Sequence, residues 1–306
     1  MGLALLLVVW LITFVSTYFF IAHPSWMWLP PVATTYGPQI DSQFTYTYIA
    51  MGIVFVAAQV ALGLFAWKYR DRGHAAAYYS HGNIRLEAVW TILTAILFVG
   101  LNLMGQHIWA QARFQGPSPG SEQVEITGMQ FQWYFRYPGS DGKYGRTLAK
   151  LEDPSTGNAL GIDPDDPAAK DDIVSSTLVL PVNRELDVTL KALDVIHDFF
   201  VPEFRFKQDA VPGLLIHMHF TPNRIGDYEI DCAELCGSGH YKMRAGVKVV
   251  SEADYQAFLK APQQWLTEHP WNGPMSRGLM QESEAKPPAP ALQLAMRHHQ
   301  SQAENH

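Results

Sequence analysis

The chain has 306 residues, of which 48% are apolar and 17% charged, and its formal net charge is −7 at pH 7. This acidic balance excludes nucleic acid as a partner, because phosphate backbones are bound by basic surfaces. The two cysteines are too few for a disulfide framework, and they are interpreted as one disulfide, as free thiols or as metal ligands.

The chain begins with long apolar runs, which end near residue 112, and continues as a polar, acidic sequence. Three runs, 3–22, 46–67 and 88–110, are long enough to cross a bilayer, which takes about 20 residues. Basic residues lie between the second and third runs but not between the first and second; they are Lys68, Arg70, Arg72 and Arg85. The positive-inside rule then makes this second loop cytoplasmic and places the chain after residue 110 outside.

The first run has two interpretations, a cleaved signal peptide and a retained helix. It has no basic segment before it, its apolar stretch is long and no clear A-x-A cleavage site follows, which favours a retained helix. Residues 1–112 are therefore predicted to form a membrane domain with two or three transmembrane helices.

Glu87 opens the third run in the segment LEAVWTIL. Its position alone is typical of an ordinary charged residue at a membrane boundary. The alternative is a carboxylate that collects protons at the cytoplasmic surface, because acids at such places often mark proton routes.

From residue 122 onward, apolar and polar residues alternate in short segments separated by Gly, Pro, Asn and Asp. The segments interpreted as strands are QVEIT, QFQWYFRY, STLVLP, RELDVTLK, LLIHMHF, GDYEID and AGVKVV. Their number and spacing predict an antiparallel sandwich or barrel. A helix is predicted at 252–260, with Ser251 as its N-cap.

Two segments have little apolar content. Residues 152–172 are acidic and are predicted to form a solvated loop, with a negative docking surface for a basic partner as the alternative. Residues 263–306 are predicted to form an extended, partly disordered tail. Three histidines near its end, His298, His299 and His306, are not interpreted as metal ligands.

Both cysteines lie in the segment DCAELCGSGHYKMRAG, which spaces Cys232, Glu234, Cys236, His240 and Met243 as C-x-E-x-C-x3-H-x2-M. A thiolate, an imidazole and a thioether form a soft donor set that selects copper. Two thiolates on one loop can bridge two copper ions, and each ion then needs one more nitrogen ligand. A strained local disulfide or two buried thiols are the alternatives, but neither accounts for the histidine and the methionine that follow.

The second histidine must come from elsewhere in the chain. His197, in ALDVIHDFFVPEF, is the best candidate because it lies ahead of a predicted strand, and a loop at a strand end can meet a ligand loop at the same end. His217 and His219 are the rivals. They alternate on one face of a predicted strand and are interpreted as structural or surface residues.

These motifs resemble a known family. CAELCGSGHYKM is similar to the binuclear copper (CuA) loop of subunit II of haem–copper cytochrome c oxidases, and DVIHDFFVPEFRFKQDAVPG to the segment with that family's first histidine ligand. GMQFQWYFRYPG resembles its aromatic strand, and LEAVWTIL the start of its second helix. The resemblance covers about residues 40–260. It implies N-terminal transmembrane helices followed by a cupredoxin-like antiparallel β-sandwich, the CuA domain, over residues 113–262.

The resemblance also implies ligand roles. Cys232 and Cys236 would bridge both copper ions, and His197 and His240 would each bind one. Met243 would be a weak ligand to one ion, and the backbone carbonyl of the residue at 234 a weak ligand to the other.

Three further roles are implied outside the copper ligands. The Glu234 side chain would reach a Mg²⁺ or Mn²⁺ ion shared with subunit I. Trp133 would receive electrons beneath a docked cytochrome c, and Glu87 would stand at the mouth of a proton channel.

The function implied is that of subunit II of a respiratory cytochrome c oxidase. It would accept electrons from cytochrome c or a similar donor and pass them to the haems of subunit I, where O₂ is reduced and protons are pumped. The implied partners are subunit I, the other oxidase subunits, the electron donor and membrane lipid. The implied location is a bacterial-type plasma membrane, crossed more than once, with the CuA domain on the periplasmic side.

The chain departs from the family in places. The family commonly has two membrane helices, and this chain has three candidate spans. It has no C-x-x-C-H motif, so a haem-bearing donor would be a separate protein, and His107 alone does not provide haem ligation. The rival functions are the copper subunit of a nitric-oxide reductase and a membrane-tethered cupredoxin that delivers copper.

Overall fold

The structure is a computed structural model that describes residues 2–22, 29–71, 73 and 81–273. Its described residues form two compact units. One unit comprises 1–119 together with the short segments 202–205 and 218–221, and the other comprises the rest of the chain.

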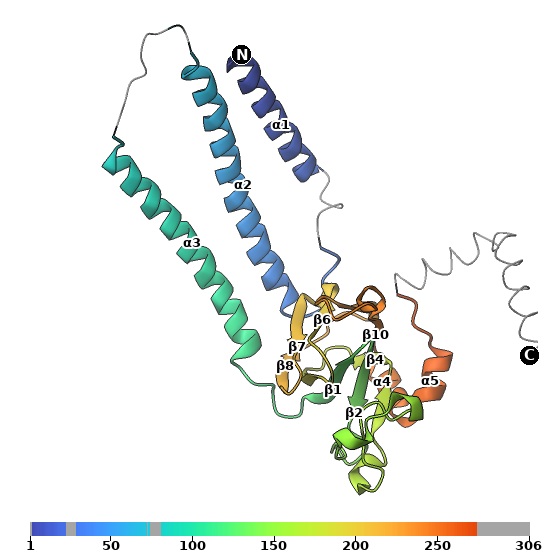
Figure 1. The fold of residues 1–306 in the computed structure, drawn as a ribbon. Coiled ribbons are helices and arrows are strands. Elements are labelled where there is room, and N and C mark those ends of the chain that lie inside the picture. Colours follow the sequence, from blue (N-terminus) through green and yellow to red (C-terminus); the bar gives the residue numbers. More distant parts are fainter. Residues whose placement is uncertain (1, 23–28, 72, 74–80, 274–306) are drawn as a thin grey trace, which may run out of the picture. The chain divides into compact units, whose positions relative to one another are not determined.

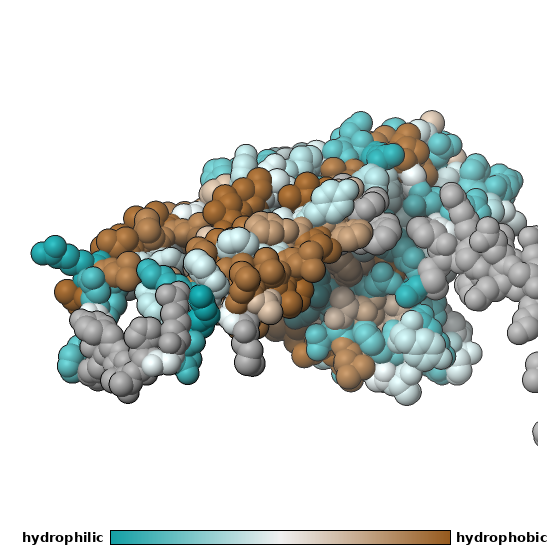
Figure 2. Space-filling view, turned by 90° about the horizontal axis from the view of Figure 1, so that it is seen from above, coloured by the Kyte–Doolittle hydropathy of each residue, from teal (hydrophilic) through white to brown (hydrophobic). Residues whose placement is uncertain are grey.

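The first unit is dominated by three helices, α1 (Gly2–Ala22), α2 (Gly37–Lys68) and α3 (Ile84–Arg113) (Figure 1). Each contains one of the predicted apolar runs, and each is long and apolar enough to cross a membrane. Most of their large apolar side chains are exposed, and Figure 2 shows hydrophobic residues over much of the helical part. Such surface is stable only where lipid or another protein covers it, so the helices fit a membrane anchor.

Two five-stranded sheets, whose orders are β3-β2-β1-β5-β8 and β4-β10-β9-β6-β7, account for most of the second unit. The strands of the first sheet are β1 (Glu122–Met129), β2 (Gln132–Tyr137), β3 (Ile173–Ser175), β5 (Leu186–Ala192) and β8 (Ile216–Phe220). Those of the second are β4 (Thr177–Pro181), β6 (His197–Val201), β7 (Phe206–Ala210), β9 (Gly226–Cys232) and β10 (Arg244–Val250). Alternate residues such as Ile126, Val188 and Ile230 are buried, so the apolar faces of the strands form the core of a β-sandwich. The predicted fold class, membrane helices followed by a β-sandwich, is confirmed.

The sheets are mixed, whereas the sequence predicted purely antiparallel ones. β1 pairs with β5 in parallel, and β10 pairs with β4 in parallel. Alternation reveals which face of a strand is buried but not the direction of its neighbour, so these pairs could not be predicted from the pattern. The pattern also missed the short strands β3, β6 and β7, although it placed a strand just after His197.

The segment between β2 and β3 is more ordered than the solvated loop that was predicted. Buried Arg136 joins it to the sheet through ion pairs with Glu125 and Asp172, and it also donates to the Gly145 carbonyl at 2.5 Å. Within the segment, Leu160 and Asp163 are buried. An acidic segment can pack in this way because Arg136 neutralises the buried Asp172 carboxylate.

Helix α4 (Glu252–Lys260) follows the second sheet, and the Ser251 hydroxyl caps it by accepting a hydrogen bond from the Asp254 amide, as predicted. A second helix, α5 (Pro262–Glu268), lies where the extended tail was predicted to begin. Buried Trp265 stabilises it by packing against Phe258. The predicted tail beyond residue 273, with His298, His299 and His306, lies outside the described residues.

Candidate metal centre

Three neighbouring strands of the second sheet bring the predicted ligands together. β6 starts at His197, β9 ends at Cys232, and β10 starts just after Met243. The order β9-β6 and β10-β9 places these strand ends side by side, and the Cys232 amide donates to the Met243 carbonyl at 3.1 Å. The ligand loop is therefore held at both ends by β-sheet pairing.

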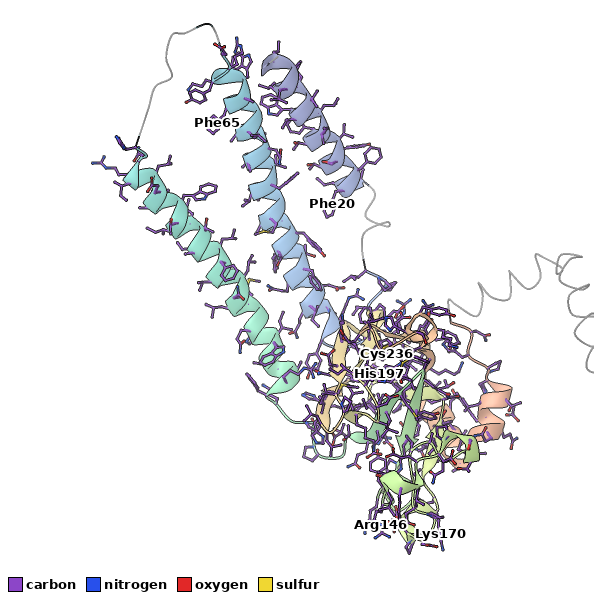
Figure 3. All side chains as sticks on the ribbon, in the orientation of Figure 1. Phe20, Phe65, Arg146, Lys170, His197 and Cys236 are labelled. Carbon is purple, nitrogen blue, oxygen red and sulfur yellow. The ribbon has the colours of Figure 1, made fainter. Side chains whose placement is uncertain are left out.

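The two thiols are free and buried, and their sulfur atoms lie 3.8 Å apart. This separation is far longer than a disulfide bond, which is about 2.05 Å, so the disulfide interpretation is wrong for this structure. Together with His197, the thiols form a group whose potential ligand atoms all lie within 4.8 Å of one another. Figure 3 shows the side chains of His197 and Cys236 close together at one end of the sandwich.

The other predicted donors surround the same sulfur atoms. The Cys232 Sγ lies 3.9 Å from His197 Nδ1 and 3.2 Å from the Glu234 carbonyl oxygen. The Cys236 Sγ lies 3.6 Å from His240 Nδ1 and 3.7 Å from Met243 Sδ. Each sulfur thus has one imidazole and one weak donor beside it, so the residues fit a soft metal such as copper.

The surroundings of the two thiols shift their pKa values in opposite directions. Burial raises the pKa of Cys232, but hydrogen bonds from His197 and the backbone outweigh it and lower the pKa to about 6. Burial and the neighbouring Cys232 thiolate raise the pKa of Cys236 to about 11. Burial opposes protonation of His197, yet its bonds to Cys232 and Asp194 raise its pKa. The pair is thus prepared to carry negative charge at Cys232 next to an imidazole.

Aromatic side chains close the buried side of the site. Trp133 has an exposed fraction of 0%, and its ring makes edge-on contacts with His197 at 6.0 Å and Phe199 at 5.9 Å between centroids. Its indole therefore packs behind a predicted ligand and has no exposed surface for a docked protein.

The rival histidines do not join the group. His217 is exposed, and His219 is buried beside the Tyr36 ring, 6.1 Å away between centroids. Although both were expected on one face of a strand, they differ in burial.

Two predicted acidic residues are exposed. The Glu234 side chain leaves the ligand loop toward solvent, while its carbonyl faces Cys232. Glu87 lies in the first turn of α3, which the Asn83 side chain caps by accepting from the amides of Arg85 and Leu86.

Sequence reasoning missed three residues that contact the centre from the turn regions beside it. Asp194 bonds to His197, Gln130 bonds to the Cys236 carbonyl, and the Phe131 ring lies against Gly237 and Gly239 of the ligand loop. An acidic residue three positions before a candidate histidine ligand was a usable signal for Asp194. Gln130 and Cys236 are 106 positions apart, and no local pattern could connect them.

Comparisons with known proteins identify relatives of this chain. Residues 124–250 match the family described as "Cytochrome C oxidase subunit II, periplasmic domain". The alternative cytochrome c oxidase subunit 2 of Bradyrhizobium diazoefficiens is 36% identical over 260 residues, which are 84% of this chain and 91% of that protein. Cytochrome c oxidase subunit 2 of Cereibacter sphaeroides is 30% identical, over 75% of this chain and 78% of that protein. Among solved structures, the periplasmic domain of subunit II of the Bradyrhizobium japonicum oxidase aligns with 48% of this chain and 96% of that one, at 29% identity and a TM-score of 0.35.

Proposed function

Since this chain belongs to the cytochrome c oxidase subunit II family, a component of haem–copper oxidases, we propose that it is the subunit through which electrons reach the oxidase. It would accept them from a c-type cytochrome or a similar metalloprotein and pass them to the haems of subunit I, where O₂ is reduced and protons are pumped. The main support is the pair of reduced thiols 3.8 Å apart, with an imidazole and a weak donor beside each sulfur.

The donor set fits a binuclear copper centre. Cys232 and Cys236 would bridge the two ions, and His197 and His240 would each bind one of them. Met243 and the carbonyl of the residue at 234 would complete the set as weak ligands. Bound copper would supply one-electron redox chemistry.

The protein's own contribution is to fix the positions of these donors and to shield them from water. His197 and Met243 have exposed fractions of 0%, and both thiols are buried. Because His197, Cys232 and Met243 lie at or next to the ends of paired strands, their positions would change little when the charge of the site changes. A site that is already organised for both charge states keeps the barrier to electron transfer low.

The remaining roles belong to the same proposal. The exposed Glu234 side chain is available to a Mg²⁺ or Mn²⁺ ion at a surface shared with subunit I. Glu87, at the N-terminus of α3, would stand at the mouth of a proton channel. Trp133, packed on His197, would conduct electrons from a donor docked above the centre.

The location follows from the helices and the matched family. Three apolar helices would anchor residues 1–112 in a bacterial-type plasma membrane, in contact with lipid and the other oxidase subunits. The copper domain, residues 113–262, would lie on the periplasmic side. We do not favour the acidic segment between β2 and β3 as the docking surface for a basic partner. Figure 3 shows Arg146 and Lys170 of that segment at the end of the sandwich away from His197 and Cys236.

Replacing Cys236 by Ser in the intact oxidase tests the proposal. A serine hydroxyl does not replace a bridging thiolate, so we expect loss of the mixed-valence copper signal and of O₂ consumption supported by a reduced c-type cytochrome. The haems of subunit I should still be reduced by dithionite. Ser238→Ala, an exposed change on the same loop, is the matched control and should leave both properties intact.

Retention of the copper signal and of turnover by Cys236→Ser would contradict the bridging role. If the purified complex reduced NO and not O₂, the chain would serve a nitric-oxide reductase. Rapid removal of copper by a mild chelator would instead support copper delivery, which the burial of the thiols argues against.

A further inference from the structure

A chain of hydrogen bonds connects His197 to the loop that carries Cys236, through residues outside the proposed ligand set. Asp194 Oδ1 lies 2.8 Å from His197 Nε2, and Asp194 Oδ2 accepts from the Gln130 amide at 2.7 Å. The Gln130 side chain then donates from Nε2 to the Cys236 carbonyl at 2.5 Å. We call this chain the Asp194–Gln130 bridge. It joins two parts of the centre that lie on different strands and loops.

The Asp194 end of the bridge selects one tautomer of His197. A carboxylate can only accept, so Nε2 must carry the hydrogen and donate it to Asp194. The other nitrogen, Nδ1, faces the Cys232 sulfur at 3.9 Å, and once Nδ1 has given up its proton its lone pair points toward the thiols. The imidazole ring is completely buried, so no water competes for this bond. A carboxylate in this position orients the ring and makes it a stronger donor to a metal.

Asp194 is itself held in place. Besides the Gln130 amide, the Val195 amide donates to Oδ1 at 2.7 Å, and these bonds help to keep the pKa of the Asp194 carboxyl below its usual value although partial burial raises it. The carboxylate is thus fixed and negatively charged at the back of the imidazole.

The Gln130 end of the bridge holds the thiol loop from the turn between β1 and β2. The Phe131 ring follows directly and packs so closely that a Cβ atom added to Gly239 would lie 2.5 Å from its Cγ. The turn therefore fixes the Cys236 loop by one strong hydrogen bond and one tight ring contact. Movement of this turn would displace both the imidazole and the thiol loop.

We propose that Asp194 and Gln130 are positioning residues of the metal centre: Asp194 fixes the tautomer of His197 and lowers the reduction potential, and Gln130 fixes the Cys236 loop. This inference rests on the proposed copper function. The potential is lowered because a fixed negative charge beside the imidazole stabilises the more positive, oxidised state. Gln130 carries no charge, so it acts on geometry alone.

The test uses the intact oxidase with its copper, measured by redox titration, copper EPR and copper release to a chelator. Asp194→Asn removes the charge and one acceptor at nearly constant shape. We expect a higher reduction potential, altered copper hyperfine splitting and roughly ten-fold to hundred-fold weaker copper retention, the range typical of lost outer-shell bonds. Asp187→Asn is the matched control, because it makes the same charge change on β5, about 20 Å from Asp194 along the strand direction. It should alter neither the reduction potential, nor the hyperfine splitting, nor the copper retention.

Gln130→Met tests the Gln130 half of the bridge separately from the Asp194 half. It remains informative if Asp194→Asn fails to fold. It keeps the length of the side chain but cannot donate to Cys236. Hyperfine splitting and copper release should change while the potential moves much less than in Asp194→Asn.

If Asp194→Asn kept the wild-type reduction potential and spectrum while the unsubstituted oxidase held its normal copper, the inference would be overturned but the proposed function would stand. Unchanged hyperfine splitting in Gln130→Met would overturn the role of Gln130. If the unsubstituted oxidase held no copper at this site, the proposed function would fail and the inference with it.

Discussion

Trp133 illustrates how far a residue role can be carried from sequence to structure. Its motif placed it beneath a docked donor, and the structure places it fully buried against His197. Electrons could pass through it to the ligand, but a donor cannot touch it. Phe131, two positions earlier in the turn between β1 and β2, is half-buried, and its ring lies against the ligand loop.

Replacing Trp133 by Phe tests the proposed path. The smaller ring weakens the contact with His197, so we expect slower reduction of the centre by a c-type cytochrome, with copper content unchanged. Stopped-flow reduction at low donor concentration measures this step. Phe131→Leu is the comparison variant, because it alters the neighbouring ring while leaving Trp133 in place. Equal rates for Trp133→Phe and the unsubstituted oxidase would remove Trp133 from the path.

Four of the predicted ligands came from short-range spacing, which is why they could be found in the sequence. Cys232, Cys236, His240 and Met243 share one loop, and soft donors at such close spacing are typical of a copper site. Asp194 and Gln130 reach the site from separate turns, 64 positions apart. The bond from Asp194 to His197 is local, but the bonds of Gln130 to Asp194 and Cys236 depend on how β1, β6 and β9 are arranged, which is tertiary information.

At the scale of elements, one tyrosine links the two sheets. The buried Tyr137 hydroxyl on β2 donates to the Val179 carbonyl at 3.0 Å and accepts from the Val179 amide at 2.7 Å on β4. These bonds satisfy both backbone groups of an edge strand inside the protein, where water cannot replace the hydroxyl. The two sheets are thereby fixed at one place by polar contacts as well as by the apolar core.

Tyr137→Phe should therefore lower the free energy of unfolding by about 1–3 kcal/mol, the cost of leaving buried backbone groups without a partner. Denaturant unfolding of the copper domain within the full chain, followed by tryptophan fluorescence, measures the change. Tyr134→Phe, on the same strand with a half-exposed side chain, is the matched control and should be close to neutral. A loss as small in Tyr137→Phe as in Tyr134→Phe would show that the link does not contribute to stability.

Strands with clear alternation were predictable, and those without it were not. β5 reads Leu186–Ala192 with every second residue buried, whereas β6 buries His197, Asp198 and Phe199 in succession. A strand that bears ligands on one face and packs on the other loses the period of two. The pattern therefore indicated a strand after His197 but not that the strand begins at the histidine itself.

At the scale of the whole molecule, the helices have surfaces suited to lipid, and the sandwich has a surface suited to water. The helices expose apolar side chains along their length, and the sandwich buries its own within two sheets. Hydropathy was sufficient to predict this division, because a membrane span needs length and apolarity rather than a particular partner. Sheet order and the parallel pairs needed the structure, because they depend on contacts between segments distant in sequence.

The most direct measurement is the amount and state of copper in the purified oxidase that contains this chain. We predict two copper ions bound to each copy of this chain, and a seven-line EPR spectrum in which one unpaired electron is shared between both ions. A single copper with a four-line spectrum, or a domain whose Cys232 and Cys236 sulfurs are bonded to each other, would contradict the account.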